Sequence, residues 1–157
     1  MTAHHPFSGE ELTISRHAPQ RWLRREGELA RWVDLPKLKR SPKQLVDFGC
    51  TQVDEELLPA LQQLWGMNVK TEFSCAGVSL KDEPEDHSLY AYVTVLHSKE
   101  TRRFVEFLMD RMRHRILITF EPERNRYDLS SFFIAHNRSF CFLLAQYARR
   151  YALGLNQ

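Results

Sequence analysis

Long apolar segments are absent from this sequence of 157 residues. The longest runs, such as Phe140 to Ala145, are far shorter than the ~20 residues that a helix needs to cross a bilayer. The N-terminal residues include His4, His5 and Glu10, where a signal peptide would carry an apolar stretch. We therefore expect a cytoplasmic protein that has no membrane partner.

Cysteine is also scarce. Cys50, Cys75 and Cys141 are odd in number and lack regular spacing, so we expect free thiols in a reducing compartment. The spacings that zinc prefers, a close cysteine pair or a histidine pair on one helical face, are missing, and no metal site is predicted. A catalytic pair, in which Cys75 is the nucleophile and His97 or His136 is its general base, stays an open alternative. The catalytic residues stay unknown, and the sequence does not decide whether the protein is an enzyme.

Repeats and low-complexity tracts are missing as well. The length is typical of one domain, and shares of 43% apolar and 27% charged residues are those of an ordinary globular protein. The net charge of +2 conceals an uneven distribution. Residues 16–43 hold nine lysines and arginines against three acids, whereas residues 47–86 hold nine acids against two lysines. This asymmetry indicates two different partners or one internal pairing.

Helical and alternating patterns predict an α+β protein. Apolar residues at helical spacing predict helices over residues 20–33, 54–66 with an N-cap at Asp54, 98–114 with an N-cap at Ser98, and 140–151 with a cap at Asn137 and an end at Gly154. Strands are predicted at Leu45–Phe48, Val69–Ser74, Leu89–Leu96, Ile116–Phe120 and Tyr127–Ala135. This order is typical of an antiparallel sheet with helices packed on one face, ferredoxin-like (split βαβ), with an extra C-terminal strand and helix. Residues 1–44 should form a basic N-terminal arm that carries the first helix, and residues 45–157 the α+β core domain.

The turn after the second predicted strand is the most unusual segment. Residues 71–77 read Thr-Glu-Phe-Ser-Cys-Ala-Gly. Such a turn at a strand end exposes backbone N–H groups and a small thiol, and its glycine lets another group approach closely. Ser74, Cys75 and Gly77 are therefore predicted to form a ligand-binding turn. The alternative is a structural turn in which Cys75 is a small buried hydrophobe.

An acidic helix precedes this strand and turn, with the run Val53-Asp54-Glu55-Glu56-Leu57-Leu58-Pro59. Together, residues 53–97 resemble the wybutosine-synthesising tRNA methyltransferase family, in which a similar helix leads to a Ser-Cys-Ser-Gly-Arg turn. Ala76 and Val78 stand where that family has its second serine and its arginine. The resemblance implies an S-adenosylmethionine-dependent enzyme that acts on a tricyclic guanosine of tRNA, with the turn in its active region. Apart from this resemblance the cofactor is unknown.

The basic segment supplies the candidate nucleic-acid-binding residues, which are Arg21, Arg24, Arg25, Arg31, Lys39 and Arg40. They are interleaved with Trp22 and Trp32. Lysine and arginine neutralise phosphates and aromatic rings stack on unpaired bases, so this mixture suits RNA. The alternative is an amphipathic helix that docks its tryptophans on the core and leaves its arginines in solvent.

The hypothesis that the sequence favours is a protein that binds or modifies RNA, tRNA in particular. The alternative is a non-enzymatic module that binds another protein, as an adaptor or an inhibitor. That alternative rests on the incomplete catalytic set and on the opposed acidic and basic segments, which suit docking to charged surfaces. A small-molecule sensor that binds under the Cys75 turn is a third hypothesis.

Overall fold

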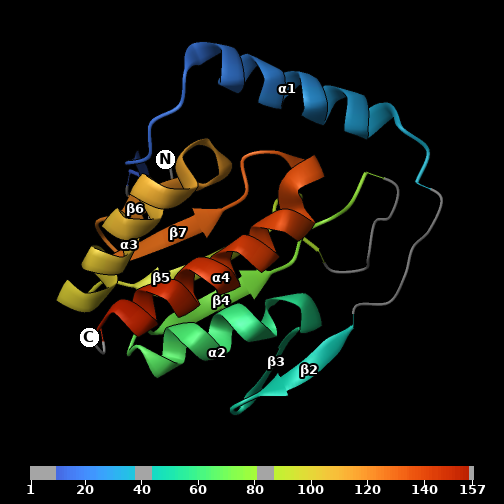
Figure 1. Cartoon of the computed structure of the whole chain (residues 1–157). Coiled ribbons are helices and arrows are strands. Elements are labelled where there is room, and N and C mark those ends of the chain that lie inside the picture. Colours follow the sequence, from blue (N-terminus) through green and yellow to red (C-terminus); the bar gives the residue numbers. More distant parts are fainter. Residues whose placement is uncertain (1–9, 38–43, 81–86, 156–157) are drawn as a thin grey trace, which may run out of the picture.

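The computed structural model describes residues 10–37, 44–80 and 87–155. Within these ranges it contains four α-helices, a five-stranded antiparallel sheet and a two-stranded sheet (Figure 1). The elements follow in the order β1 (Leu12–Thr13), α1 (Pro19–Asp34), β2 (Leu45–Phe48), β3 (Thr51–Asp54), η1 (Glu55–Leu57), α2 (Leu58–Gly66), β4 (Thr71–Cys75), β5 (Tyr92–Leu96), α3 (Lys99–Met112), η2 (Arg113–Arg115), β6 (Leu117–Glu121), β7 (Arg126–Ser130), η3 (Ile134–His136) and α4 (Asn137–Leu155). The predicted α+β class and its antiparallel sheet are confirmed.

The five-stranded sheet has the order β1-β6-β7-β5-β4, and every neighbouring pair is antiparallel. Leu129 of β7 lies opposite both Val93 of β5 and Ile118 of β6, so the three side chains share one face, where all are fully buried. They belong to the main core together with Phe104 of α3 and Phe140 of α4. Figure 1 shows α2, α3 and α4 on the same side of the sheet.

The strand predicted at Leu45–Phe48 forms, but it lies outside this sheet. β2 pairs with β3 through a two-residue turn at Gly49 and Cys50, where Gly49 has φ +63. A two-residue turn that begins with a left-handed residue matches the twist of an antiparallel hairpin, so β2 finds its partner locally. This corrects the predicted strand order, because β7, which comes much later in the chain, lies beside β5.

Asp54 has a different role from the predicted helix cap. Its side chain makes no capping hydrogen bond to η1. Its Oδ2 instead accepts a hydrogen bond from the backbone N–H of Ala76 at 2.7 Å. The regular helix α2 begins at Leu58 and has Pro59 in its first turn, where a missing donor is tolerated. A bond to a distant turn has therefore replaced the local cap.

In the second half of the chain, the structure agrees with the prediction at the start of α3 and differs from it at the end of β7. Ser98 caps α3, since its Oγ accepts a hydrogen bond from the N–H of Thr101 at 3.0 Å. The strand predicted to reach Ala135 ends at Ser130, because the chain turns into η3. This early end places residues 131–136 against α1, which is bonded to their backbone.

Candidate nucleic-acid interface

The tryptophans of α1 fasten this helix to the rest of the protein. Trp32 is 6% exposed, and its Nε1 donates a hydrogen bond to the carbonyl oxygen of Ser79 at 3.0 Å. The Trp22 ring packs against Phe132, with 5.0 Å between the ring centroids. Aromatic rings in such positions contribute mainly through burial. Both tryptophans therefore dock α1 onto the core, as the alternative interpretation of this segment predicted.

Arg25 also takes part in this docking. Its guanidinium donates hydrogen bonds to the carbonyl oxygens of Phe132 at 2.7 Å and Ser131 at 3.4 Å, and it lies 3.8 Å from the centroid of the Tyr90 ring. Burial lowers the pKa of Arg25, while neighbouring Tyr90 and Glu28 act in the opposite direction. Arg25 is thus held by internal contacts.

A second group of arginines lies on the surface where α1 meets η2. Arg21 donates a hydrogen bond to the carbonyl oxygen of His114 at 3.1 Å. Burial lowers the pKa of Arg21, and the nearby positive charges of Arg24 and Arg115 lower it further. In the described part of the chain, none of these three arginines forms an ion pair with a carboxylate. We call Arg21, Arg24, Arg113, His114 and Arg115 the basic surface.

The positive charges of the basic surface lower the pKa values of three nearby histidines. The pKa of His114 is lowered by burial, and then by Arg21, Arg115 and Arg113. The pKa values of His17 and His136 are also lowered by burial first, and next by Arg21 and Arg115, respectively. These rings are therefore held neutral near pH 7, and an anion that offset the arginines would favour their protonation.

Sequence reasoning located only one side of this surface. Arg21 and Arg24 belong to the predicted basic segment, whereas residues 113–115 are more distant in sequence and were missed. Their only signal is a basic run at the end of a helix, which is an ordinary feature because it complements the helix dipole. Arg31, which was also predicted to bind nucleic acid, is exposed on α1. Lys39 and Arg40 lie outside the described residues.

The predicted ligand-binding turn is largely buried. Cys75 is 5% exposed, Gly77 is buried and Ser74 is half-buried. The N–H of Ala76, which a ligand would need, already donates to the carboxylate of Asp54. These contacts favour the structural alternative for the turn, and ligand binding by Ser74, Cys75 and Gly77 stays a prediction.

Asn137 holds this turn from the start of α4. Its Oδ1 accepts a hydrogen bond from the N–H of Ala91 at 2.9 Å, and its Nδ2 donates to the carbonyl oxygens of Val78 at 2.6 Å and Leu89 at 2.9 Å. Asn137 is only 1% exposed, so these bonds satisfy a side chain that would otherwise be costly to bury. Gly77 lies directly against it with φ +77.

All three cysteines are thiols and not disulfide-bonded, as predicted. Burial raises the pKa of the Cys141 thiol to about 12, which makes it a core side chain and a poor nucleophile. Cys50 is exposed in the β2–β3 turn. Across the described ranges, no group of three or more His, Cys, Asp or Glu side chains is placed to hold a metal ion.

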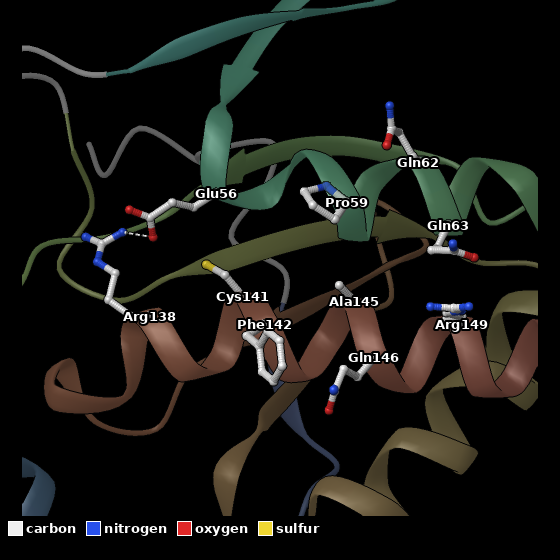
Figure 2. Close-up of a pocket in the computed structure, with 10 residues that line it drawn as sticks. All are labelled: Glu56, Pro59, Gln62, Gln63, Arg138, Cys141, Phe142, Ala145, Gln146 and Arg149. Carbon is white, nitrogen blue, oxygen red and sulfur yellow. Dashed lines mark hydrogen bonds and ion pairs between the residues drawn. The ribbon is translucent and has the colours of Figure 1, made fainter.

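A groove of about 570 Å³ lies between α2 and α4 (Figure 2). Its lining includes Pro59 of α2 and Ala145 of α4, and the Phe142 side chain beside them is 61% exposed. Arg138 and Glu56 form an ion pair at one end. The groove therefore combines apolar walls with a charged end.

The helix-free face of the sheet is acidic. Asp128 lies opposite Thr94 and Thr119, on the face away from the core. Its pKa is raised to about 6, first by burial and then by the negative charges of Glu11 and Glu121. Its Oδ1 is buried and has no hydrogen-bond partner among the described residues. The ionised form of Asp128 is therefore disfavoured in the folded protein.

Replacement Asp128→Asn should remove a pH-dependent loss of stability. The folded-state pKa of about 6 lies above the unfolded value of about 3.9, so the folded protein binds this proton more tightly and loses stability as the pH rises from about 4 through 6. Relative to wild type, the variant should gain about 2 kcal/mol in unfolding free energy between pH 4.5 and pH 7.5. Urea titrations of both proteins at the two pH values measure this change. If the difference in unfolding free energy between the variant and the wild type were the same at both pH values, the prediction would be contradicted.

Comparison with protein-family models, with curated proteins and with solved structures gives no match. The family resemblance of residues 53–97 therefore rests on the residues quoted for it. In the part of the chain that the structure describes, no helix combines the length and apolarity needed to span a bilayer.

Proposed function

We propose that this protein is a cytoplasmic RNA-binding protein and that the basic surface is where RNA binds. The observation that carries the proposal is the convergence of Arg21 and Arg24 from α1 with Arg115 from η2. Arg21 donates a hydrogen bond to the carbonyl oxygen of His114 in η2, and its pKa is lowered by burial first and then by the like charges of Arg24 and Arg115. A cluster of this kind is stabilised by a polyanion, whose binding also releases condensed counterions.

The fold supports this choice of surface. Strands β4 to β7 with α3 and α4 resemble a ferredoxin-like unit in permuted order, in which β7 and α4 follow the other elements instead of preceding them. Some four-stranded sheets of this kind bind RNA on their helix-free face through aromatic side chains. Here that face carries Asp128 and Glu121 beside Arg126, a charge pattern that repels phosphate. The basic surface is the better candidate.

Transfer RNA is the first RNA to test, because residues 53–97 resemble the wybutosine-synthesising methyltransferases. If the resemblance extends to chemistry, S-adenosylmethionine is the cofactor, and the protein modifies the RNA that it binds. The buried Ser74, Cys75 and Gly77 turn is then the region to probe, starting with binding of S-adenosylmethionine by calorimetry.

The test of RNA binding is a salt titration. Fluorescence anisotropy with a single-stranded RNA and with a tRNA transcript should show binding at about 50 mM salt that weakens steeply up to about 300 mM. Three to four phosphate contacts predict a slope of log K against log salt of about −2 to −3. Absence of binding to both RNAs at the lowest salt would overturn the proposal.

A second candidate function is binding of another protein, as an adaptor or an inhibitor. The groove between α2 and α4 favours it, because Phe142 is 61% exposed beside apolar walls (Figure 2). Large exposed aromatic side chains are enriched at protein interfaces. Affinity capture with wild type and with Phe142→Ser should then recover a partner that only the wild type retains.

A further inference from the structure

A second groove, of about 560 Å³, lies between α1 and η3 and adjoins the basic surface. Arg24 and Arg31 of α1 line it on either side of Gly27, and His136 of η3 lines its opposite wall. Three and four residues separate Gly27 from the two arginines, so all three share one face of the helix. The groove therefore presents two guanidinium groups above a position that has no side chain.

Gly27 lines the groove without a side chain. Glycine inside a helix is unfavourable by roughly 0.5–1 kcal/mol relative to alanine, so its position calls for a reason. A Cβ atom at this position would lie 3.3 Å from Nη1 of Arg31, which is tighter than most such contacts. The missing side chain thus leaves room for the Arg31 guanidinium next to the helix backbone.

Among the described residues that line the groove, Glu28 supplies the one carboxylate, and this carboxylate is already hydrogen-bonded to the protein. The two oxygens of Glu28 accept hydrogen bonds from the backbone N–H groups of Ile134 at 2.6 Å and Ala135 at 3.0 Å. A carboxylate held in this way is satisfied by the donors at the start of η3 and has no bond to Arg24 or Arg31. Glu28 keeps its negative charge, but its oxygens are occupied by η3, so the donors of the two guanidinium groups stay available for a ligand.

His136 adds a polar atom without a partner. Its Nδ1 is buried and makes no hydrogen bond with any described residue. The pKa of His136 is lowered by burial first and then by Arg115, so an incoming anion would reverse part of this shift. Leu23, which is 67% exposed, forms an apolar edge of the same groove.

We propose that this groove binds a phosphate monoester, the 5′-terminal phosphate of an RNA strand, between Arg24 and Arg31, with the first nucleoside against Leu23. This inference rests on the proposed RNA binding and deepens it. A monoester carries almost two negative charges at pH 7, which match the two guanidinium groups, whereas each internal phosphodiester carries one. A cavity of this size suits one nucleotide.

The test compares two RNA oligonucleotides of one sequence, labelled at the 3′ end, that carry either a 5′-phosphate or a 5′-hydroxyl. The wild type should bind the phosphorylated form about 10-fold more tightly. In Arg24→Gln/Arg31→Gln the ratio of the two affinities should fall to about one. The matched control Arg103→Gln/Arg149→Gln removes the same charge from exposed positions on α3 and α4 and should keep the wild-type ratio.

Further arms separate the possible outcomes. Gly27→Ala, which keeps every charge, should raise the melting temperature and still lower the preference for the 5′-phosphate. Equal affinity of the wild type for both oligonucleotides would overturn the pocket while leaving RNA binding intact, and binding of neither would overturn RNA binding itself. Adenosine monophosphate should bind at least about 10-fold more weakly than the phosphorylated strand, because Arg24 is the one residue of the basic surface that it reaches. If it binds as tightly, the ligand is a free nucleotide and the assignment to an RNA end is wrong.

Discussion

Replacement of Gly77 by alanine is expected to destabilise the protein by about 4 kcal/mol. The residue has φ +77, a left-handed conformation that costs an L-residue roughly 1–2 kcal/mol. A Cβ atom would also lie 2.5 Å from Nδ2 of Asn137 and 2.6 Å from the backbone nitrogen of Ala91, and overpacking of this kind costs roughly 1–3 kcal/mol. Both neighbours are held by the hydrogen bonds of Asn137, so neither can move without breaking them.

The measurement is urea unfolding of Gly77→Ala beside Gly49→Ala. Gly49 also has a positive φ, of +63, but nothing lies within 4 Å of its Cβ position. This control therefore measures the cost of the left-handed backbone conformation without any steric overlap. We expect Gly49→Ala to lose about 1 kcal/mol and the melting temperature of Gly77→Ala to fall by roughly 10 °C. Equal losses in the two variants would show that the turn at Gly77 is not packed against Asn137.

The second large effect concerns RNA. The triple variant Arg24→Gln, Arg113→Gln and Arg115→Gln should bind single-stranded RNA about 100-fold more weakly at low salt, and the salt slope should decrease by about 2. These arginines make none of the hydrogen bonds that dock α1, which come from Arg25, Trp32 and neighbouring residues. The fold should therefore stay intact while the affinity falls.

A matched triple variant controls for net charge. Arg103→Gln, Arg149→Gln and Arg150→Gln remove three exposed charges from α3 and α4, and none of these residues belongs to the basic surface or lines the groove beside it. Its affinity should fall by less than about 3-fold, since screening weakens charges that lie more than about 10 Å from the ligand. Similar losses in the two triple variants would mean that RNA binding follows net charge and not the basic surface.

The periodic parts of the fold follow from the sequence. Helix α1 matches its predicted span within a residue or so at each end, and Ser98 caps α3 as expected, because spacing and capping are local. Asp54 and Asn137 looked like caps, and both instead bond to distant backbone groups around the Ser74 to Gly77 turn. The same side-chain atoms suit a cap or a tertiary bond, and only the three-dimensional arrangement decides between them.

The candidate site could be predicted only where its residues are close in sequence. A run rich in arginine and tryptophan indicates a basic helix, but it does not show which arginines face outward. Arg25 turned out to bond inward to Phe132, whereas Arg24, the next residue along the chain, belongs to the basic surface. The contribution of η2 depends on how α1 crosses the end of the sheet, which no local pattern encodes.

The measurement that tests the account most directly is an NMR titration of the uniformly labelled protein with single-stranded RNA at low salt. The account predicts that amide shifts concentrate at residues 21–31, 113–115 and 134–136, and that they disappear as salt is raised. Shifts confined to the helix-free face around Asp128, or to the groove beside Phe142, would contradict it and show that the basic surface is not where RNA binds.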